Sequence, residues 1–364
     1  MALKRILIAG GGTGGHIFPA VAVANALKKA NPDVEILFVG AKGKMEMEKV
    51  PQAGYKIEGL DIAGFDRSSL IKNISLPIKL IKSFWQVKQI FKTFRPDAAF
   101  GVGGYSSFPV LKYAQQKGIP TFIHESNAFA GKSNILLGKN ATLVMVAASG
   151  MEKFFPKEKI VVTGNPIRAK IADTAKISKL DAVNAFGLAP AKKVVFAMGG
   201  SLGAKSINES MDAGIGTLLE NDLQVIWQTG KLYAEQAKKS TGNKPGVYTS
   251  AFISDMETAY AAADYIVSRA GAMSVAELCV VGKPVIFVPF PFAAEDHQTA
   301  NAKSLVDKHA ALMISDNEVR SKLINELLTL NNDTIKAETL SRNIKESAVA
   351  SADVTIADLI IKNV

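Results

Sequence analysis

The sequence has very little cysteine and no long apolar run. Cys279 is the single cysteine among 364 residues, which excludes an internal disulfide and a cysteine metal cluster. No run reaches the ~18 uninterrupted apolar residues of a transmembrane helix. Residues 1–5 lead straight into an apolar strand pattern, so we expect no signal peptide. Together these absences predict a cytosolic protein.

Acidic residues are scarce in the first half of the chain. Residues 1–165 carry 22 Lys and Arg against 11 Asp and Glu, whereas the remainder carries 21 against 22. A basic half favours an anionic partner, such as a membrane surface or a nucleic acid, although a solvated basic surface fits the charge equally well. Nucleic acid is the less favoured partner, because no recognised nucleic-acid-binding module accompanies the charge.

Short apolar runs typical of buried strands alternate with helical patterns through both halves of the chain. Such alternation predicts α/β domains, each with a doubly wound parallel sheet. We expect an N-terminal domain over residues 1–165 and a C-terminal domain over 166–344, with ligands beyond the carboxyl ends of the strands. The pattern of the last helix assigns it to neither domain. The expected strands lie at residues 6–9, 36–39, 98–102, 121–123, 143–146, 160–162, 194–198, 225–227, 265–267 and 285–288.

A glycine-rich turn at residues 10–15 follows the first strand and leads into a helix expected over residues 19–30. Glycines allow a ligand close to backbone amides, and the start of a helix favours anions, so the turn suits a phosphate. His16 is the one residue there that exchanges protons near neutral pH. The turn satisfies the dinucleotide-binding pattern, but the acid expected after the next strand is missing. Likewise, residues 199–206 miss the second glycine of a phosphate-loop ATPase, because Ala204 stands there.

Residues 71–95 contain no acid and have helical spacing from Pro77 onward. Basic residues beside exposed aromatics are typical of a helix lying on an anionic bilayer. A packed helix with a solvated basic face is the alternative. The large apolar residues proposed to enter the membrane are Ile78, Ile81, Phe84 and Trp85.

Polar side chains gather where several expected strands end. In the first half they are Tyr105, His124, Glu125 and Asn127. In the second half, Arg269 suits a phosphate because its guanidinium is always charged and bidentate. Glu277 suits a pair of sugar hydroxyls, although the sequence pattern fits a solvent-facing helix residue without a ligand equally well. Turns that suit a phosphate, together with side chains that suit sugar hydroxyls, favour a site for a nucleotide sugar. Because the chain has no Asp-x-Asp triplet, we expect no metal, and Arg269 with helix N-termini would stabilise a leaving diphosphate.

Eight blocks make the chain similar to a known family over essentially its whole length: 11–20, 101–107, 124–131, 164–168, 199–204, 252–256, 268–277 and 297–302. With these blocks the chain resembles the bacterial glycosyltransferases of the MurG family. They add N-acetylglucosamine to undecaprenyl-diphospho-N-acetylmuramoyl-pentapeptide, converting lipid I to lipid II. The resemblance implies a GT-B fold, an inverting transfer that makes a β-1,4 bond and releases UDP, and no cofactor.

The resemblance also implies roles for individual residues. The C-terminal half would bind UDP-N-acetylglucosamine, with Ser201 on the diphosphate, the Ile253 backbone on the uracil, Glu277 on the ribose and Gln298 on the sugar. Five residues at the start of a helix would lie over the diphosphate: Ala272, Met273, Ser274, Val275 and Ala276. The donor site would be completed by Thr13, Gly14, Gly15, Asn127 and Arg168. One departure is His297, where the family pattern leads us to expect a second glutamine beside Gln298.

His16 is the candidate base on the acceptor hydroxyl, because a histidine has a suitable pKa, and Glu125 is the second candidate. Tyr105 would lie on the acceptor side, in the N-terminal domain that would meet lipid I and the membrane. A helix at about 345–364 would pack back on that domain. The expected location is the cytoplasmic face of the inner membrane, as a peripheral protein, with other cell-wall synthesis proteins as further partners. The alternatives are another GT-B enzyme acting on a lipid acceptor and a nucleotide-sugar-binding protein without turnover.

Overall fold

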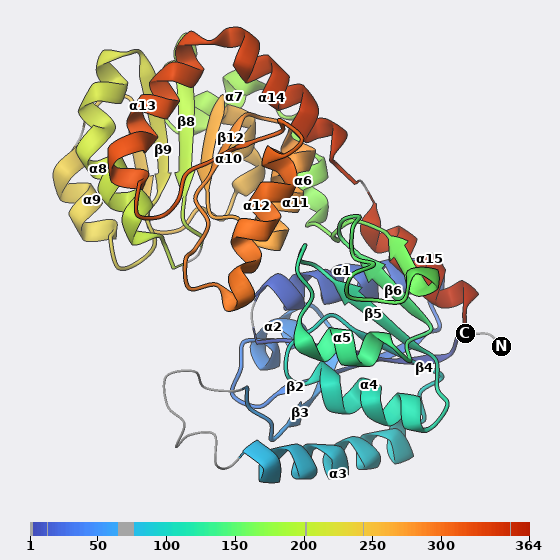
Figure 1. The fold of residues 1–364 in the computed structure, drawn as a ribbon. Coiled ribbons are helices and arrows are strands. Elements are labelled where there is room, and N and C mark those ends of the chain that lie inside the picture. The colour runs from blue at the N-terminus through green and yellow to red at the C-terminus, as the bar shows by residue number, and fades with distance from the viewer. Residues whose placement is uncertain (1–2, 13, 65–75, 201, 243, 350) are drawn as a thin grey trace. The chain divides into compact units, whose positions relative to one another are not determined.

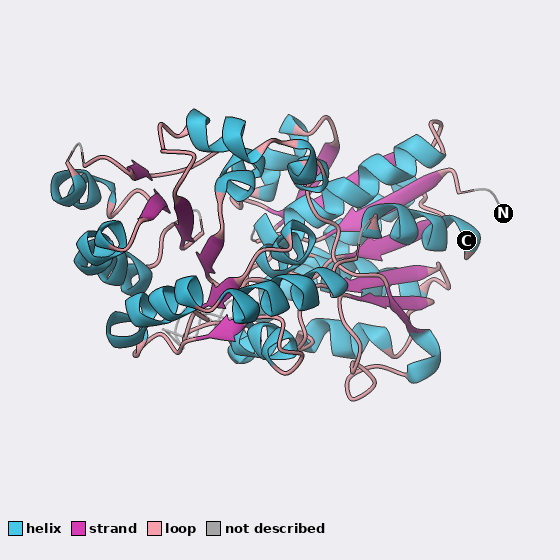
Figure 2. Cartoon of the chain, turned by 90° about the horizontal axis from the view of Figure 1, so that it is seen from above, coloured by secondary structure: helices cyan, strands magenta, loops and turns pink. Residues whose placement is uncertain are grey.

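The computed structural model describes all residues except 1–2, 13, 65–75, 201, 243 and 350. The chain folds into two compact units: unit 1 comprises residues 1–168 with 351–364, and unit 2 comprises residues 169–350. Each unit has one sheet in which all strand pairs are parallel, with helices on both faces (Figures 1 and 2). The α/β fold class expected from the sequence is therefore confirmed.

Unit 1 contains a seven-stranded sheet whose strand order reverses between β1 and β4, as in doubly wound folds. In spatial order the strands are β3 (Lys56–Leu60), β2 (Glu35–Ala41), β1 (Arg5–Ala9), β4 (Ala98–Gly101), β5 (Thr121–Glu125), β6 (Leu143–Val146) and β7 (Ile160–Val162). The helices are α1 (Gly14–Ala30), α2 (Glu46–Gln52), α3 (Leu76–Phe94), α4 (Ser107–Gln116), α5 (Lys132–Gly138) and α15 (Ala352–Lys362), with the 3₁₀ helix η2 (Lys157–Lys159).

Two apolar layers cover the two faces of this sheet, because successive side chains of a strand point to opposite faces. Ile6 and Ile8 of β1 pack with α1 and α15. Leu7 and Ala9 of the same strand pack with α3, α4 and α5 on the other face. Helix α15 packs along α1 and so belongs to unit 1 (Figure 1).

Unit 2 contains a six-stranded sheet that reverses between β8 and β11. In spatial order the strands are β10 (Val247–Ser250), β9 (Leu223–Gln228), β8 (Lys193–Met198), β11 (Tyr265–Ser268), β12 (Val285–Phe287) and β13 (Leu312–Met313). The helices are α6 (Ala169–Ala172), α7 (Lys179–Ala185), α8 (Lys205–Glu220), α9 (Ala234–Thr241), α10 (Met256–Ala262), α11 (Ala272–Val281), α12 (His297–Val306), α13 (Val319–Asn332) and α14 (Thr334–Glu346), with 3₁₀ helices η3 (Thr174–Lys176) and η4 (Ala294–Asp296). The core on one face combines β8 and β9 with α8, α13 and α14.

Helix α1 begins earlier than the sequence pattern indicated. We expected a helix over residues 19–30, but α1 starts at Gly14 and contains Pro19. Proline within a helix removes one backbone hydrogen bond, and this loss did not stop the helix. As a result, the candidate site residues Gly14, Gly15 and His16 form the first turn of α1 instead of lying in the preceding loop.

Among the described residues, no helix is long and apolar enough to span a membrane. Likewise, the described part of the chain holds no group of three or more His, Cys, Asp or Glu side chains that could bind a metal ion.

Candidate functional site

Three loops of unit 1 leave the same edge of its sheet. Ala9, Gly101 and Ile123 are paired across neighbouring strands, so the segments that follow β1, β4 and β5 emerge side by side. The first two loops are in close contact, since a Cβ on Gly104 would lie 2.5 Å from the carbonyl oxygen of Gly11. Gly104 also has φ of 87°, which favours glycine. The chain can therefore bring the two glycine loops together only with glycine at this position.

His16 lies half-buried where these loops meet. Its Nδ1 is 3.1 Å from the carbonyl oxygen of Gly11. A carbonyl oxygen only accepts hydrogen bonds, so Nδ1 carries the proton, and Nε2 carries the lone pair of the neutral ring. Nε2 faces the second loop, because a Cβ on Gly103 would lie 3.0 Å from it. This geometry presents a basic nitrogen beside two glycine-rich turns.

Glu46 is a buried acid that the sequence pattern did not indicate. It begins α2 and is 1% exposed. Its Oε2 accepts a hydrogen bond from the amide of Gly12 at 2.8 Å, and its Oε1 accepts one from the amide of Ala41 at 3.0 Å. The carboxylate therefore ties the turn after β1 to the end of β2. The glycine turn was expected to bind a phosphate through its backbone amides, but the Gly12 amide is occupied by the Glu46 side chain.

Glu125 is also buried, and its carboxylate is saturated with hydrogen bonds. Oε1 accepts from the backbone and side-chain amides of Asn127, while Oε2 accepts from the Gly131 amide and the Asn134 side chain. The arrangement makes Glu125 the organiser of the loop after β5.

His124 joins the loop after β5 to the segment that leads out of β7. Its ring is fully buried, with Nε2 3.0 Å from the carbonyl oxygen of Gly164 and Nδ1 3.3 Å from Ser126 Oγ. The Gly164 carbonyl accepts a hydrogen bond, so Nε2 carries the proton. Burial lowers the pKa of His124, and the nearby His16 lowers it further, although the Gly164 carbonyl and Glu125 oppose the shift. His124 is therefore neutral at pH 7.

The remaining unit 1 candidates lie close to these loops. The Tyr105 side chain is half exposed and packs on Gly64. Arg168 is exposed and Asn127 is half-buried. Thr13 lies outside the described residues.

In unit 2, helix α11 begins directly after β11 and presents its first amides at the sheet edge, with Gly271 as N-cap. Ala272 to Ala276 form its first turns. Glu277 follows in the same helix and is buried, with Tyr260 donating to it at 3.4 Å. Glu277 is thus not the solvent-facing residue of the alternative interpretation. Glu277, which the resemblance assigns to the ribose, is therefore buried within unit 2.

Arg269, at the end of β11, is held by the protein itself. Its guanidinium donates to the carbonyl oxygens of Val288 and Pro289 at 3.1 Å and to the Asp316 carboxylate. The side chain is largely buried and also stacks on the ring of Phe290. Asp316 offsets its charge, so the guanidinium is not a free cation for a phosphate. Its role as a diphosphate ligand stays a prediction.

Two glutamines fix the loops around this sheet edge. Gln228, at the end of β9, accepts from the Ile253 amide at 2.9 Å and donates to the Gly200 carbonyl at 3.1 Å. The Ile253 amide is therefore occupied by the protein itself. Gln298 accepts from the Phe290 amide at 2.9 Å. Ser201 lies outside the described residues.

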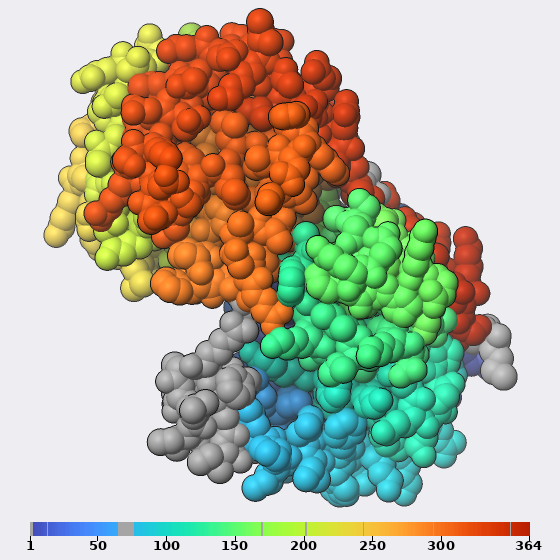
Figure 3. Space-filling model, viewed as in Figure 1, coloured from blue at the N-terminus to red at the C-terminus, as the bar shows by residue number. Residues whose placement is uncertain are grey.

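The proposed membrane helix α3 lies on the surface of unit 1, beside α4 (Figures 1 and 3). Ile78, Ile81 and Trp85 are 71%, 72% and 63% exposed. Phe84 differs from them, because its ring packs edge-on against Phe108 with the centroids 6.4 Å apart. The exposed apolar set therefore excludes Phe84, which anchors α3 to α4.

Comparison with known proteins agrees with this architecture. Residues 6–146 match the glycosyltransferase family 28 N-terminal domain, and residues 194–356 match the glycosyltransferase family 28 C-terminal domain. The crystal structure of Acinetobacter baumannii MurG has 29% identity and a TM-score of 0.81, covering 99% of this chain and 100% of that one. A UDP-GlcNAc 2-epimerase from Neisseria meningitidis, solved with UDP-GlcNAc, shares only the fold, at 15% identity and a TM-score of 0.70, covering 99% of this chain and 100% of that one.

Two curated relatives are named UDP-N-acetylglucosamine–N-acetylmuramyl-(pentapeptide) pyrophosphoryl-undecaprenol N-acetylglucosamine transferase. The one from Bacteroides thetaiotaomicron is 51% identical over 362 residues, covering 98% of this chain and 97% of the relative. The one from Flavobacterium psychrophilum is 46% identical over 362 residues, covering 100% and 98%. The chain thus has the GT-B fold and belongs to glycosyltransferase family 28, within the MurG group of N-acetylglucosamine transferases.

Proposed function

We propose that the protein transfers N-acetylglucosamine from UDP-N-acetylglucosamine to undecaprenyl-diphospho-N-acetylmuramoyl-pentapeptide, giving lipid II and UDP. The observation that carries this proposal is the 51% identity to a transferase of that name along nearly the full length of both chains. The products feed peptidoglycan synthesis. The finer assignments below rest on the geometry of each unit.

In the proposed mechanism, unit 1 supplies the base. Nε2 of His16 takes the proton from the 4-hydroxyl of the acceptor sugar as that oxygen attacks the anomeric carbon of the donor. The bond from the anomeric carbon to the UDP oxygen breaks on the opposite side, so the configuration inverts to β. The acceptor's own diphosphate would lie along the glycine turn that follows β4, where backbone amides and the start of α4 favour anions. Tyr105 would line this acceptor side.

Unit 2 would bind the donor. The uracil would meet the Ile253 carbonyl, and the ribose hydroxyls would meet the Glu277 carboxylate. The leaving diphosphate would lie at the N-terminus of α11, whose amides and dipole stabilise the charge that develops there. Gln298 would hold the N-acetylglucosamine.

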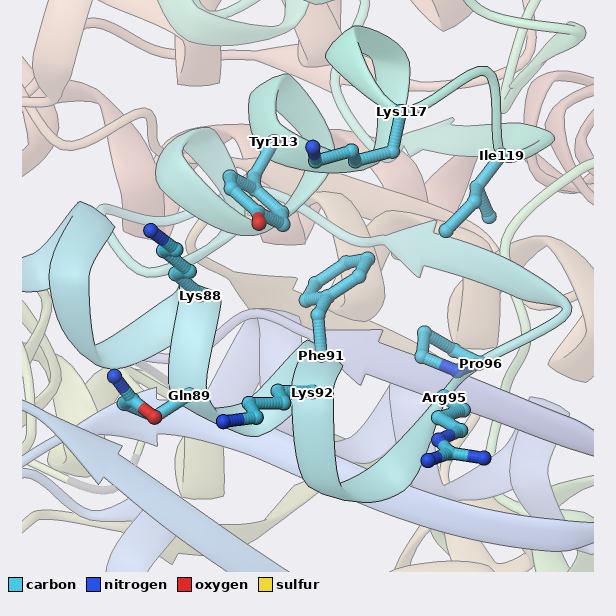
Figure 4. Close-up of a pocket in the computed structure, with 9 residues that line it drawn as sticks. All are labelled: Lys88, Gln89, Phe91, Lys92, Arg95, Pro96, Tyr113, Lys117 and Ile119. Carbon is cyan, nitrogen blue, oxygen red and sulfur yellow. The ribbon is translucent and has the colours of Figure 1, made fainter.

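The exposed residues of α3 support docking to an anionic membrane. Ile78, Ile81 and Trp85 are followed along the same face of α3 by Lys88 and Lys92, at spacings of three or four residues, and Arg95 comes directly after the helix ends at Phe94. The basic residues border a pocket of about 590 Å³ between α3 and α4, into which Phe91 and Tyr113 point (Figure 4). Lys117 adds a fourth cation. On such a surface the apolar side chains would enter the bilayer while the basic side chains bind anionic headgroups. The proposed location of the protein is the cytoplasmic face of the inner membrane.

The test is turnover of UDP-N-acetylglucosamine with a lipid I analogue, followed by release of UDP and by the linkage of the product. We expect a β-1,4 disaccharide. Transfer to a diacylglycerol but not to the lipid I analogue would support a different GT-B enzyme, and donor binding without transfer to either acceptor would support a binding protein. His16→Ala should then lower kcat at saturating substrates. Near-normal turnover would contradict the assignment of the base.

A further inference from the structure

The peptide group between Gly11 and Gly12 is held from both of its ends. Its N–H, which belongs to Gly12, donates to Glu46 Oε2 at 2.8 Å. Its C=O, which belongs to Gly11, accepts from His16 Nδ1 at 3.1 Å. The described peptide bonds include no cis bond, so these two groups point in opposite directions. A buried carboxylate, one peptide group and the imidazole therefore form a continuous line of hydrogen bonds.

We propose that Glu46 is a positioning residue for His16 and acts on it through the Gly11–Gly12 peptide. This proposal rests on the proposed function, in which His16 is the base. In hydrolases with a catalytic triad, a carboxylate bonded directly to the histidine fixes its tautomer and stabilises the imidazolium. Here one peptide group stands between the two side chains.

The peptide can transmit this effect because hydrogen bonds in a chain polarise one another. An anion at the N–H increases the negative charge on the carbonyl oxygen. That oxygen then holds the Nδ1 proton more firmly and stabilises the ring once Nε2 has taken a second proton. The carboxylate also fixes the plane of the peptide, and hence the direction in which Nε2 points.

The local packing is built around Glu46. A Cβ on Gly11 would lie 2.3 Å from the Glu46 carboxyl carbon, and a Cβ on Gly40 would lie 2.5 Å from its Cγ. Both positions therefore need glycine for the carboxylate to reach the peptide. The second hydrogen bond, from the Ala41 amide, fixes the other oxygen. Such placement would be unnecessary for a side chain that only caps a surface helix.

Two other groups bear on the charge of His16. His124 lies close enough to interact with it, and burial lowers the pKa of His124, so that ring stays neutral in the working range. Glu125, next to His124, is bound by four donors within its own loop. Glu46 is therefore the carboxylate whose hydrogen bonds lead to the His16 ring.

The first test uses the wild-type chain, so it does not depend on a variant folding. Protein labelled with ¹⁵N-histidine reports the tautomer of each ring, and His16→Gln identifies the His16 signals. We expect a neutral His16 ring protonated on Nδ1. A ring protonated on Nε2 would overturn the proposal, because the Gly11 carbonyl could not then accept its proton.

The second test is Glu46→Gln, with Glu48→Gln as the matched control on the exposed side of the same helix. The amide keeps the shape of Glu46 but removes the charge and one acceptor. We expect kcat to fall on the order of 10- to 100-fold and the acid limb of the kcat/KM profile to move to lower pH. The KM for UDP-N-acetylglucosamine should change less than kcat does, because the groups proposed for the uracil, the ribose and the N-acetylglucosamine lie in unit 2. Glu48→Gln should match the wild type.

The outcomes separate this proposal from the proposed function. A Glu46→Gln enzyme with wild-type kcat and an unmoved acid limb would overturn the role of Glu46. A folded variant that loses activity without any shift of the acid limb or of the tautomer would mean that Glu46 is only structural, which also overturns it. If His16→Ala retains turnover, the base assignment fails, while the tautomer measurement still decides whether Glu46 orients His16.

Discussion

Arg269 and Asp316 form an ion pair in unit 2, with the guanidinium of Arg269 largely buried. Asp316 Oδ1 also accepts a hydrogen bond from Ser206, and the Arg269 guanidinium reaches the same hydroxyl oxygen at 3.3 Å. Because Arg269 also holds the carbonyls of Val288 and Pro289, the pair fixes the segment that follows β12 to the end of β11. The geometry supports a positioning role for Arg269 in donor binding.

The variants Arg269→Ala and Asp316→Ala distinguish positioning from direct contact with the diphosphate. If Arg269 positions the loops, each variant should lose roughly 2–3 kcal/mol of stability and raise the KM for UDP-N-acetylglucosamine, and the double variant should lose less than the sum. Urea unfolding and steady-state kinetics measure both quantities. Arg320→Ala, which removes an exposed arginine paired with Glu209 in the same unit, is the control. A rise in KM for Arg269→Ala alone would favour direct phosphate contact.

Gln228 should control donor affinity because it ties the Ile253 amide to the Gly200 carbonyl. Gln228→Leu removes both hydrogen bonds, so the two loops proposed for uracil and diphosphate lose their connection. We expect the KM for UDP-N-acetylglucosamine to rise about tenfold with a smaller change in kcat. Gln224→Leu is the matched control, since Gln224 lies on the same strand and bonds both backbone groups of Ala189 away from these loops. Equal KM changes in both variants would contradict the proposal.

Glu125 should contribute mainly to the stability of unit 1. Glu125→Gln replaces one carboxylate oxygen by an amide nitrogen, which cannot accept the hydrogen bonds that this oxygen receives. We expect a loss of roughly 2–4 kcal/mol in the free energy of unfolding, with the acid limb of the kcat/KM profile unchanged. Urea unfolding and pH-dependent kinetics test this, with the exposed Glu152→Gln as control. A stable variant with an altered pH profile would instead make Glu125 the base.

The strands that form the centre of each sheet could be predicted from sequence, because a strand buried on both faces is a continuous apolar run. All ten expected strands are present in the structure. The three missed strands, β3, β10 and β13, lie at sheet edges. In β3, Lys56 and Glu58 alternate with less polar residues, which is typical of an exposed edge and resembles a loop in composition.

The candidate site could be predicted only in part, because some of its residues are placed by local sequence and others by packing between distant elements. Glycine turns and His16 stand next to apolar strands, so their position follows from local sequence. Glu46 stands between Met45 and Met47 in a charged stretch whose pattern indicates an exposed helix. It is buried by the packing of α2 against β2 and β3 and by the turn that follows β1. Likewise, helical spacing predicted that Phe84 lies on α3, but its ring is covered because it packs against Phe108 of α4.

His124 should make the protein less stable as the pH falls. Burial lowers its pKa below the ordinary 6.5, so the unfolded chain takes up a proton at a higher pH than the folded chain does. Between the two pKa values the unfolded state binds more protons, and stability falls by up to about 1.4 kcal/mol per pH unit. Urea unfolding at pH 7 and pH 5.5 should show a smaller loss for His124→Gln than for the wild type. Identical losses would contradict this account.

Membrane docking through α3 predicts a specific effect of its exposed apolar residues. Replacing Ile81 and Trp85 with Ser should lower binding to vesicles containing anionic phospholipid by about tenfold or more, because less apolar surface enters the bilayer. Sedimentation with vesicles measures this, while turnover of a soluble acceptor analogue should persist.

Two controls make this prediction sharper. Ile335→Ser removes an equally exposed apolar side chain from α14 in unit 2 and should leave vesicle binding unchanged. Replacing Lys88, Lys92 and Arg95 with Gln should weaken binding most at low salt, since attraction between exposed charges is screened as ionic strength rises. If the Ile81 and Trp85 variant partitions like the wild type, α3 is a packed surface helix, and its apolar residues have another role.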